Sequence, residues 1–255
     1  MRVTVVSDVH GAAEPLERAA RECDVLVVLG DLLNMIDYRS MDGILVDVLG
    51  REPVATAASL RGRGLYEEAR ATIRAVGMDE HEMRAQVFEL AARQYREVLG
   101  VLPPGAVVTF GNADIPELLR SLLPEGVRFV DGEVVELAGL RWGIVGGGVP
   151  TPLHIPGEVP EDRWTEKLDA LGDVDVIGTH PPPRIPWFCY DLVAKKFEPG
   201  STPLVRYIVE RRPRFALFGH VHQPMMGEGT LGATKLVNVG HFRGNAPGWT
   251  YESPD

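Results

Sequence analysis

Seven side chains of the types that bind metal ions stand directly after short apolar runs of this sequence. They are Asp8 and His10 in SDVHG, Asp31 in LGDLLN, Asn112 in TFGNAD, His180 in GTHPPP, and His220 and His222 in FGHVHQP. Carboxylate, imidazole and amide oxygen are all ligands of divalent cations. Taken singly, each of these residues has an ordinary explanation as a turn residue, a helix cap or a loop histidine. Their shared position after an apolar run instead predicts one common site.

The number and spacing of these side chains favour two ions over one. His220 and His222 lie two residues apart, so on an extended chain both side chains point to the same face. Seven ligands exceed the needs of a single ion. Two divalent ions about 3.5–4 Å apart, with one carboxylate between them, would use the whole set.

The apolar runs that precede these residues are typical of buried strands. They are Arg2–Val6, Val25–Leu29, Val107–Phe110, Arg141–Val145, Val174–Ile177 and Phe215–Phe218. Helical patterns at Ala13–Arg21 and Ile115–Leu123 alternate with them, which predicts an α/β sheet with the polar side chains at the carboxyl ends of its strands. Two later runs without helices, Thr234–Asn238 and Trp249–Glu252, predict antiparallel strands and a mixed second sheet.

Residues 35–103 interrupt this alternation. Apolar residues at helical spacing, together with a capping pair at Asp79 and Glu82, predict an inserted helical hairpin. This pattern fits a lid, a surface for homo-oligomer formation, or a decoration packed on the core, and the sequence does not choose among them.

Composition restricts the partners. The chain has 255 residues and a net charge of −10, with 36 acidic residues against 26 Lys and Arg, which disfavours an extended nucleic acid. A small phosphate ester held at a local cationic site is not excluded. No signal peptide and no apolar run of the roughly 20 residues that a membrane span needs is expected. The two cysteines, Cys23 and Cys189, lack metal-binding spacing, so a reducing cytoplasm is the expected location.

Five motifs occur in a recognisable order: D-x-H, G-D, G-N, a single His after a strand, and G-H-x-H. This series resembles the calcineurin-like metallophosphoesterase superfamily, and in particular its smaller bacterial and archaeal phosphodiesterase-like members of the G-N-x-D type. The resemblance implies a four-layer α-β-β-α sandwich of two mixed sheets with a dinuclear metal site on one edge. It also implies a single domain over residues 1–255, within which residues 35–103 are an insertion.

The resemblance further assigns the ligands of two divalent ions, manganese being favoured over iron or zinc. One ion is held by Asp8, His10, Asp31 and His222, and the other by Asp31, Asn112, His180 and His220. Asp31 bridges the two ions and is expected to be the most sensitive of the set. Asp31, Asn112 and His180 are therefore also the expected catalytic residues.

The expected activity is hydrolysis of a small phosphate ester, a phosphodiester being favoured, by attack of metal-bound hydroxide. The alternatives are a phosphomonoesterase or pyrophosphatase, and a metal-binding scaffold with weak or no catalysis. Many members of the superfamily carry His after the asparagine as a donor to the leaving group, whereas this chain has Ala113. His241 is a candidate replacement, ahead of His154, whereas His81 is expected on the solvated surface at the start of a helix of the insertion; Arg39 is a candidate contact for the substrate phosphate. Asp114 is expected to cap the helix that follows it.

Overall fold

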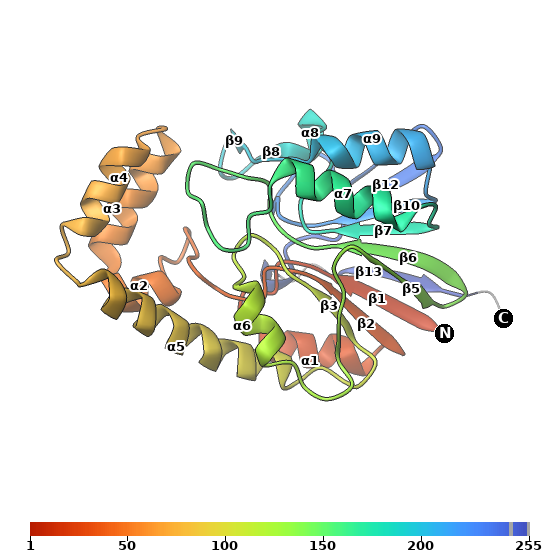
Figure 1. The fold of residues 1–255 in the computed structure, drawn as a ribbon, viewed down its shortest axis with the longest axis horizontal. Coiled ribbons are helices and arrows are strands. Elements are labelled where there is room, and N and C mark those ends of the chain that lie inside the picture. The colour runs from red at the N-terminus through yellow and green to blue at the C-terminus, as the bar shows by residue number, and fades with distance from the viewer. Residues whose placement is uncertain (245–246, 254–255) are drawn as a thin grey trace.

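Two β-sheets face each other at the centre of the molecule, in a computed structural model that describes residues 1–244 and 247–253 (Figure 1). The first sheet has the strand order β13-β1-β2-β3-β4 and the second β11-β12-β10-β7-β6-β5. Each sheet contains four neighbouring strands that run parallel. Antiparallel strands lie at one edge of the first sheet, β13, and at both edges of the second, β5 and β11. The strands are β1 Arg2–Val6, β2 Val25–Leu29, β3 Val107–Thr109, β4 Arg128–Phe129, β5 Glu133–Leu137, β6 Leu140–Val145, β7 Val176–Thr179, β10 Phe215–Phe218, β11 Glu228–Leu231, β12 Thr234–Asn238 and β13 Trp249–Glu252.

Helices cover the outer faces of both sheets, which completes four layers (Figure 1). Helices α1, α5 and α6 lie on the first sheet, and α7 and α9 on the second. Their bounds are α1 Ala13–Arg21, α5 Glu80–Leu99, α6 Pro116–Ser121, α7 Glu161–Leu171 and α9 Thr202–Arg211. The predicted fold class, an α-β-β-α sandwich of two mixed sheets, is confirmed.

The alternation of side chains along the central strands explains this layering. In β2, Val27 and Leu29 belong to the core between the two sheets, whereas Leu26 and Val28 belong to the core under the helices. Successive residues of a strand point to opposite faces, so a strand buried on both faces must be apolar at every position. This requirement is why Val25–Leu29 is an uninterrupted apolar run.

The insertion contains more helices than the predicted hairpin. Two predicted helices correspond to α4 (Tyr66–Arg74) and α5, and α2 (Ile44–Leu49) and α3 (Arg51–Gly62) precede them. The antiparallel partner of α4 is α3, not α5, while α5 packs on α1, α2 and α6. Asp79 caps α5 as predicted, because its side chain accepts hydrogen bonds from the backbone N–H groups of His81 and Glu82.

Helix α5 joins the core to the α3–α4 pair, which projects to the left in Figure 1. Its C-terminal half contributes Ala91, Tyr95, Val98 and Leu99 to the core under the helices, which we call the main core. The α3–α4 pair makes a further contact with the body through Arg70 of α4, whose guanidinium donates a hydrogen bond to the carbonyl of Pro152.

The remaining elements are short. They are α8 Pro186–Cys189, the two-stranded β8 Tyr190–Asp191 and β9 Lys196–Phe197, and the 3-10 helix η1 Phe242–Gly244. Among the helices in the described part of the chain, none combines the length and the apolar character that crossing a membrane requires.

Candidate metal centre

All seven predicted ligand residues come together where the two sheets present their carboxyl ends. Asp8 and His10 follow β1, Asp31 follows β2 and Asn112 follows β3, so the first sheet supplies four of them. The second sheet supplies His180 after β7, and His220 and His222 after β10. We call Asp8, His10, Asp31, Asn112, His180, His220 and His222 the ligand cluster.

The backbone of the ligand cluster is strained. Asp8, His10, Asp31 and His220 have φ values of 60°, 44°, 52° and 68°, in the left-handed region. An ordinary L-residue in this region costs about 1–2 kcal/mol. Hydrogen bonds between the loops hold the conformation: Asp8 N–H donates to Gly30 O at 3.1 Å and His10 N–H donates to Asp31 O at 2.9 Å. Such strain clusters at functional sites, where the surrounding structure compensates for it.

Glycines precede three of the cluster residues because there is no room for a β-carbon. A β-carbon on Gly111 would lie 2.1 Å from Asp31 Oδ1, and one on Gly219 would lie 2.2 Å from Asp8 Oδ2. One on Gly30 would lie 2.3 Å from the backbone nitrogen of Gly111. The G-D, G-N and G-H pairs of the sequence are therefore a steric requirement for bringing the loops of the two sheets together.

The two oxygens of Asp31 face different histidines. Asp31 Oδ1 lies 3.4 Å from His180 Nε2, and Asp31 Oδ2 lies 3.9 Å from His10 Nε2. The same Nε2 atom of His180 also lies 3.0 Å from Asn112 Oδ1. The carboxylate of Asp31 thus lies between two groups of side chains, as a bridging ligand would.

Asp8 lies between His10 and His222, on the side of the site that Asp31 Oδ2 faces. Its Oδ1 lies 3.3 Å from His222 Nε2 and 3.8 Å from His10 Nε2, while the two imidazole Nε2 atoms are 3.2 Å apart. Asp8 Oδ2 accepts a hydrogen bond from the backbone N–H of His220 at 2.9 Å. Asp8 therefore ties the loop after β10 to the loop after β1.

Backbone carbonyls fix the orientation of two of the imidazoles. His10 Nδ1 lies 2.9 Å from Leu33 O, and His180 Nδ1 lies 3.0 Å from Leu29 O. A carbonyl only accepts, so each Nδ1 carries a proton and each Nε2 faces the cluster, where it can bind a cation once any proton on Nε2 has left. Metal-binding histidines are oriented in this way.

The charges of the cluster act strongly on one another. Burial alone would lower the pKa of His180, but the carboxylates of Asp31 and Asp8 raise it to about 9. Burial and the neighbouring His180 lower the pKa of His220 to about 4. A proton on His180 thus supplies the positive charge that the two buried carboxylates attract, and a cation would supply the same charge.

The donor set fits a divalent cation. Within the described residues, Asp8 Oδ1 and His220 Nε2 are buried polar atoms of the cluster without a hydrogen-bond partner. A buried polar atom left without a partner costs about 1–3 kcal/mol. An ion coordinated by both oxygen and nitrogen would satisfy these atoms, and mixed ligation of this kind suits manganese, iron or zinc.

His241 joins the site, whereas the other candidate histidines do not. The His241 ring stacks on His222 at 3.9 Å between centroids, with an angle of 2° between the planes. Burial, together with His222 and His10, lowers the pKa of His241 to about 4. His81, at the start of α5, and His154 are exposed, and within the described residues nothing connects them to the cluster.

Arg39 acts on His241 through its charge. Its side chain is exposed, and its charge contributes to the lowered pKa of His241. Its backbone N–H donates to Asp37 Oδ1 at 2.8 Å, which fixes the turn that carries it.

The expected role of Asp114 as a helix cap is wrong. Ile115 is the N-cap of α6, and no side chain caps that helix. Asp114 is instead buried beneath the ligand cluster, where its Oδ2 accepts from Gly111 N–H at 2.9 Å and its Oδ1 accepts from Leu32 N–H at 3.0 Å. Burial and the charge of Asp31 raise the pKa of Asp114 to about 7.

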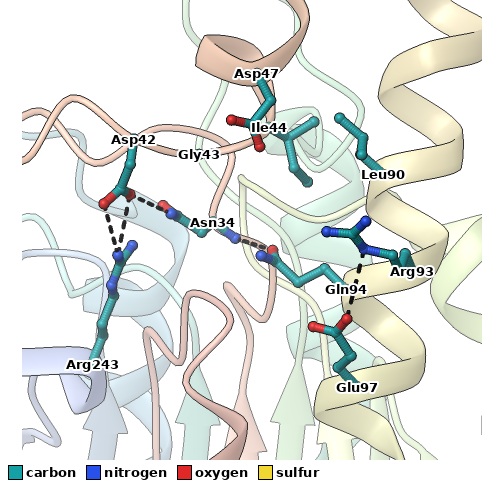
Figure 2. A pocket seen from close by; sticks show the side chains of 10 residues that line it. All are labelled: Asn34, Asp42, Gly43, Ile44, Asp47, Leu90, Arg93, Gln94, Glu97 and Arg243. Carbon is teal, nitrogen blue, oxygen red and sulfur yellow. Dashed lines mark hydrogen bonds and ion pairs between the residues drawn. The ribbon is translucent and has the colours of Figure 1, made fainter.

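Sequence reasoning also missed a polar series that runs from the site to the insertion. Figure 2 shows Arg243, Asp42, Asn34 and Gln94 linked in turn beside a cavity of about 250 Å³. Arg243 Nη2 donates to Asp42 Oδ1 at 3.1 Å, and Asn34 Nδ2 donates to the same atom at 2.8 Å. The Asn34 N–H donates to Gln94 Oε1 of α5 at 2.6 Å. No sequence motif pairs these residues, which come from three separate segments.

Comparisons with known proteins agree with this geometry. Residues 1–224 match the family model described as calcineurin-like phosphoesterase. No curated protein matches the sequence. One solved crystal structure, at 19% sequence identity, has a TM-score of 0.61 over 94% of this chain and 91% of that chain. The crystal structure of TT1561 of Thermus thermophilus, at 16% identity, has a TM-score of 0.50 over 95% of this chain and 90% of that chain.

The likeness to the two solved structures concerns the fold alone, because their sequence identities are low. The family match is more specific, since it extends from before Asp8 to beyond His222 and so includes the whole ligand cluster. The chain therefore belongs to the calcineurin-like phosphoesterases, and this membership implies metal-dependent hydrolysis of phosphate esters.

Proposed function

We propose that the protein hydrolyses phosphodiesters at a site of two divalent cations. The observation that carries the two-ion assignment is the position of Asp31, with Oδ1 directed at His180 and Oδ2 at His10. Asp8, His10 and His222 would complete the ligands on one side of Asp31, and Asn112, His180 and His220 would complete them on the other. Manganese is the favoured ion.

The chain's own residues would act mainly by positioning. When bound, the two cations would withdraw charge from the phosphoryl oxygens and lower the pKa of a water ligand, so that hydroxide is available for in-line attack on phosphorus. The carbonyls of Leu29 and Leu33 would keep His180 and His10 oriented for binding. Arg39, which is exposed and whose charge acts on His241, would contact a non-reacting phosphoryl oxygen of the substrate.

The balance of charge favours a diester over a monoester. A diester carries one negative charge and a monoester dianion carries two, so a monoester would gain more from a further cationic group besides the two ions. Arg243 is already committed, with Nη2 at 3.1 Å from Asp42 and Nη1 at 3.7 Å from Asp37. The exposed Arg39, whose charge acts on His241, favours the second candidate, a phosphomonoesterase, because it offers a further positive charge.

The first test compares initial rates on bis(p-nitrophenyl) phosphate and p-nitrophenyl phosphate. We expect no turnover after chelation, recovery on addition of Mn²⁺, and a faster rate on the diester. Both esters share a good leaving group, so the alanine at position 113 does not bias the comparison. A faster monoester rate would favour the phosphomonoesterase, and no Mn²⁺-dependent turnover of either ester would favour a metal-binding scaffold.

We propose His241 as the hydrogen-bond donor to the leaving oxygen, in the absence of a histidine at Ala113. Replacing His241 by alanine should then lower kcat for an alkyl phosphodiester by about 10²-fold or more, the range for the loss of one hydrogen-bond donor to a developing negative charge. The rate on bis(p-nitrophenyl) phosphate should change far less, because p-nitrophenolate leaves without such help.

The matched control for this variant is His81→Ala, which removes an exposed histidine at the start of α5. It should leave both rates unchanged. An equal loss on both substrates in His241→Ala would contradict the donor role and indicate a contribution to the binding of the ions.

A further inference from the structure

A buried carboxylate connects the loops that carry Asp31 and Asn112. Asp114 Oδ1 accepts hydrogen bonds from the backbone N–H groups of Leu32 and Leu33, at 3.0 and 3.3 Å, in the loop after β2. Its Oδ2 accepts from the N–H of Gly111, at 2.9 Å, in the loop after β3. One side chain thus sets the distance between two loops, each of which presents a residue of the ligand cluster.

The hydroxyl of Tyr95 completes this arrangement from the insertion. It donates to Asp114 Oδ1 at 3.0 Å and accepts from the N–H of Ile115 at 2.9 Å. The exposed fraction is 0% for Tyr95 and 1% for Asp114, so water does not compete for these bonds. Loss of a buried hydrogen bond leaves its partner unsatisfied, which costs free energy because water cannot replace the lost group.

Tyr95 is also the point at which the insertion meets the site. It lies on α5, the helix that carries the α3–α4 pair, and its ring is part of the main core. In consequence, the position of α5 relative to the first sheet determines where Asp114 lies, and Asp114 determines where the two loops lie.

We propose that Tyr95 is a positioning residue of the metal centre, which acts through Asp114 to hold Asp31 and Asn112 at the separation that two ions require. The inference rests on the proposed two-ion site and adds to it a function for the insertion. It assigns to α5 a part of the site's affinity for metal, separate from any role of the insertion as a lid or an oligomer surface.

The test is the substitution Tyr95→Phe, which keeps the buried ring and removes only the hydroxyl. The control is Tyr207→Phe on α9, where a tyrosine 2% exposed donates its hydroxyl to Gly172 O at 2.7 Å, on the outer helical layer of the second sheet. Both variants lose one hydrogen-bonded tyrosine hydroxyl, and only the hydroxyl of Tyr95 connects to the ligand cluster.

Each chelated protein is titrated with Mn²⁺, and free Mn²⁺ is followed by electron paramagnetic resonance. Mutation of residues that orient metal ligands typically weakens metal binding by about 10–100-fold. We expect a loss of about 10-fold or more in Tyr95→Phe and none in Tyr207→Phe. In a parallel rate measurement, Tyr95→Phe should need more Mn²⁺ for half-maximal activity but approach the wild-type rate at saturation.

The outcomes separate this inference from the proposed function. Wild-type affinity in Tyr95→Phe, or an equal loss in both variants, would overturn the role of Tyr95 and leave the two-ion site in place. Failure of the wild-type protein to bind Mn²⁺ would overturn the two-ion site, and with it the inference. Thermal unfolding of the two chelated variants checks that their Mn²⁺ affinities are compared between folded proteins.

Discussion

Replacement of Asp31 by asparagine is expected to lower kcat by more than about 10³-fold, the equivalent of several kcal/mol of transition-state stabilisation. Asparagine has nearly the same shape and tolerates the left-handed backbone at this position, where φ is 52°. It can also still accept the hydrogen bond that the Ala113 N–H donates to Oδ1 at 2.8 Å. What it loses is the charge and the second oxygen, which a bridging ligand needs.

The measurement combines steady-state rates with the number of Mn²⁺ ions bound per chain, which should fall from two. Asp175→Asn is the matched control, because Asp175 also lies next to a strand and its Oδ2 accepts from the Arg141 N–H at 2.9 Å, away from the site. Retention of two ions and of activity in Asp31→Asn would rule out the bridging role.

A single methyl group at Gly111 is expected to disable the site almost as completely. In Gly111→Ala the new β-carbon would lie 2.1 Å from Asp31 Oδ1 and 2.7 Å from Asp31 N. The loop cannot retreat freely, because the Gly111 N–H is held by Asp114 at 2.9 Å. We expect a fall in activity of more than about 10²-fold, because small displacements of reacting groups have effects of this size. Overpacking should also lower the free energy of unfolding by about 1–3 kcal/mol.

Gly62→Ala is the control for this substitution, since its β-carbon would meet no atom within 4 Å at the end of α3. It should be neutral or slightly stabilising, as alanine is favoured over glycine in a helix. Activity, Mn²⁺ binding and denaturant unfolding are measured for both variants. Wild-type values in Gly111→Ala would show that the loops after β2 and β3 leave room for a methyl group.

Strands buried on both faces were predictable from the sequence because burial alone determines their composition. The expected segments Arg2–Val6 and Val25–Leu29 agree with β1 and β2 residue for residue. The ligand cluster was predictable for a related reason: parallel strands bring their carboxyl ends to one edge, so residues distant in sequence must meet there.

The features that sequence reasoning missed depend on contacts between distant segments. Helix α3 was not predicted, because its partly buried face relies on small residues such as Ala57 and on a partner, α4, rather than on a strong apolar stripe. Asp114 resembles a helix cap in the sequence, and only the tertiary contact with Tyr95, 19 residues earlier, shows its actual role.

His241 lay between these two cases. Its place after an apolar run made it a candidate, but its position depends on the way the C-terminal segment returns to β1. The N–H of Phe242 donates to Ser7 O at 3.0 Å, and this contact brings His241 to His222.

The joining of β1 to β13 has a consequence for the order of events during synthesis. β13 pairs with β1 along residues 2–5, and the adjacent Arg243 N–H donates to Asp8 O at 3.2 Å. Asp8 and His10 leave the ribosome well before His222, which lies 212 residues after His10. The nascent chain therefore carries acidic and imidazole ligands long before it can enclose an ion: the ligand cluster is complete only once His222 has been made, and β13 then pairs with β1 beside it.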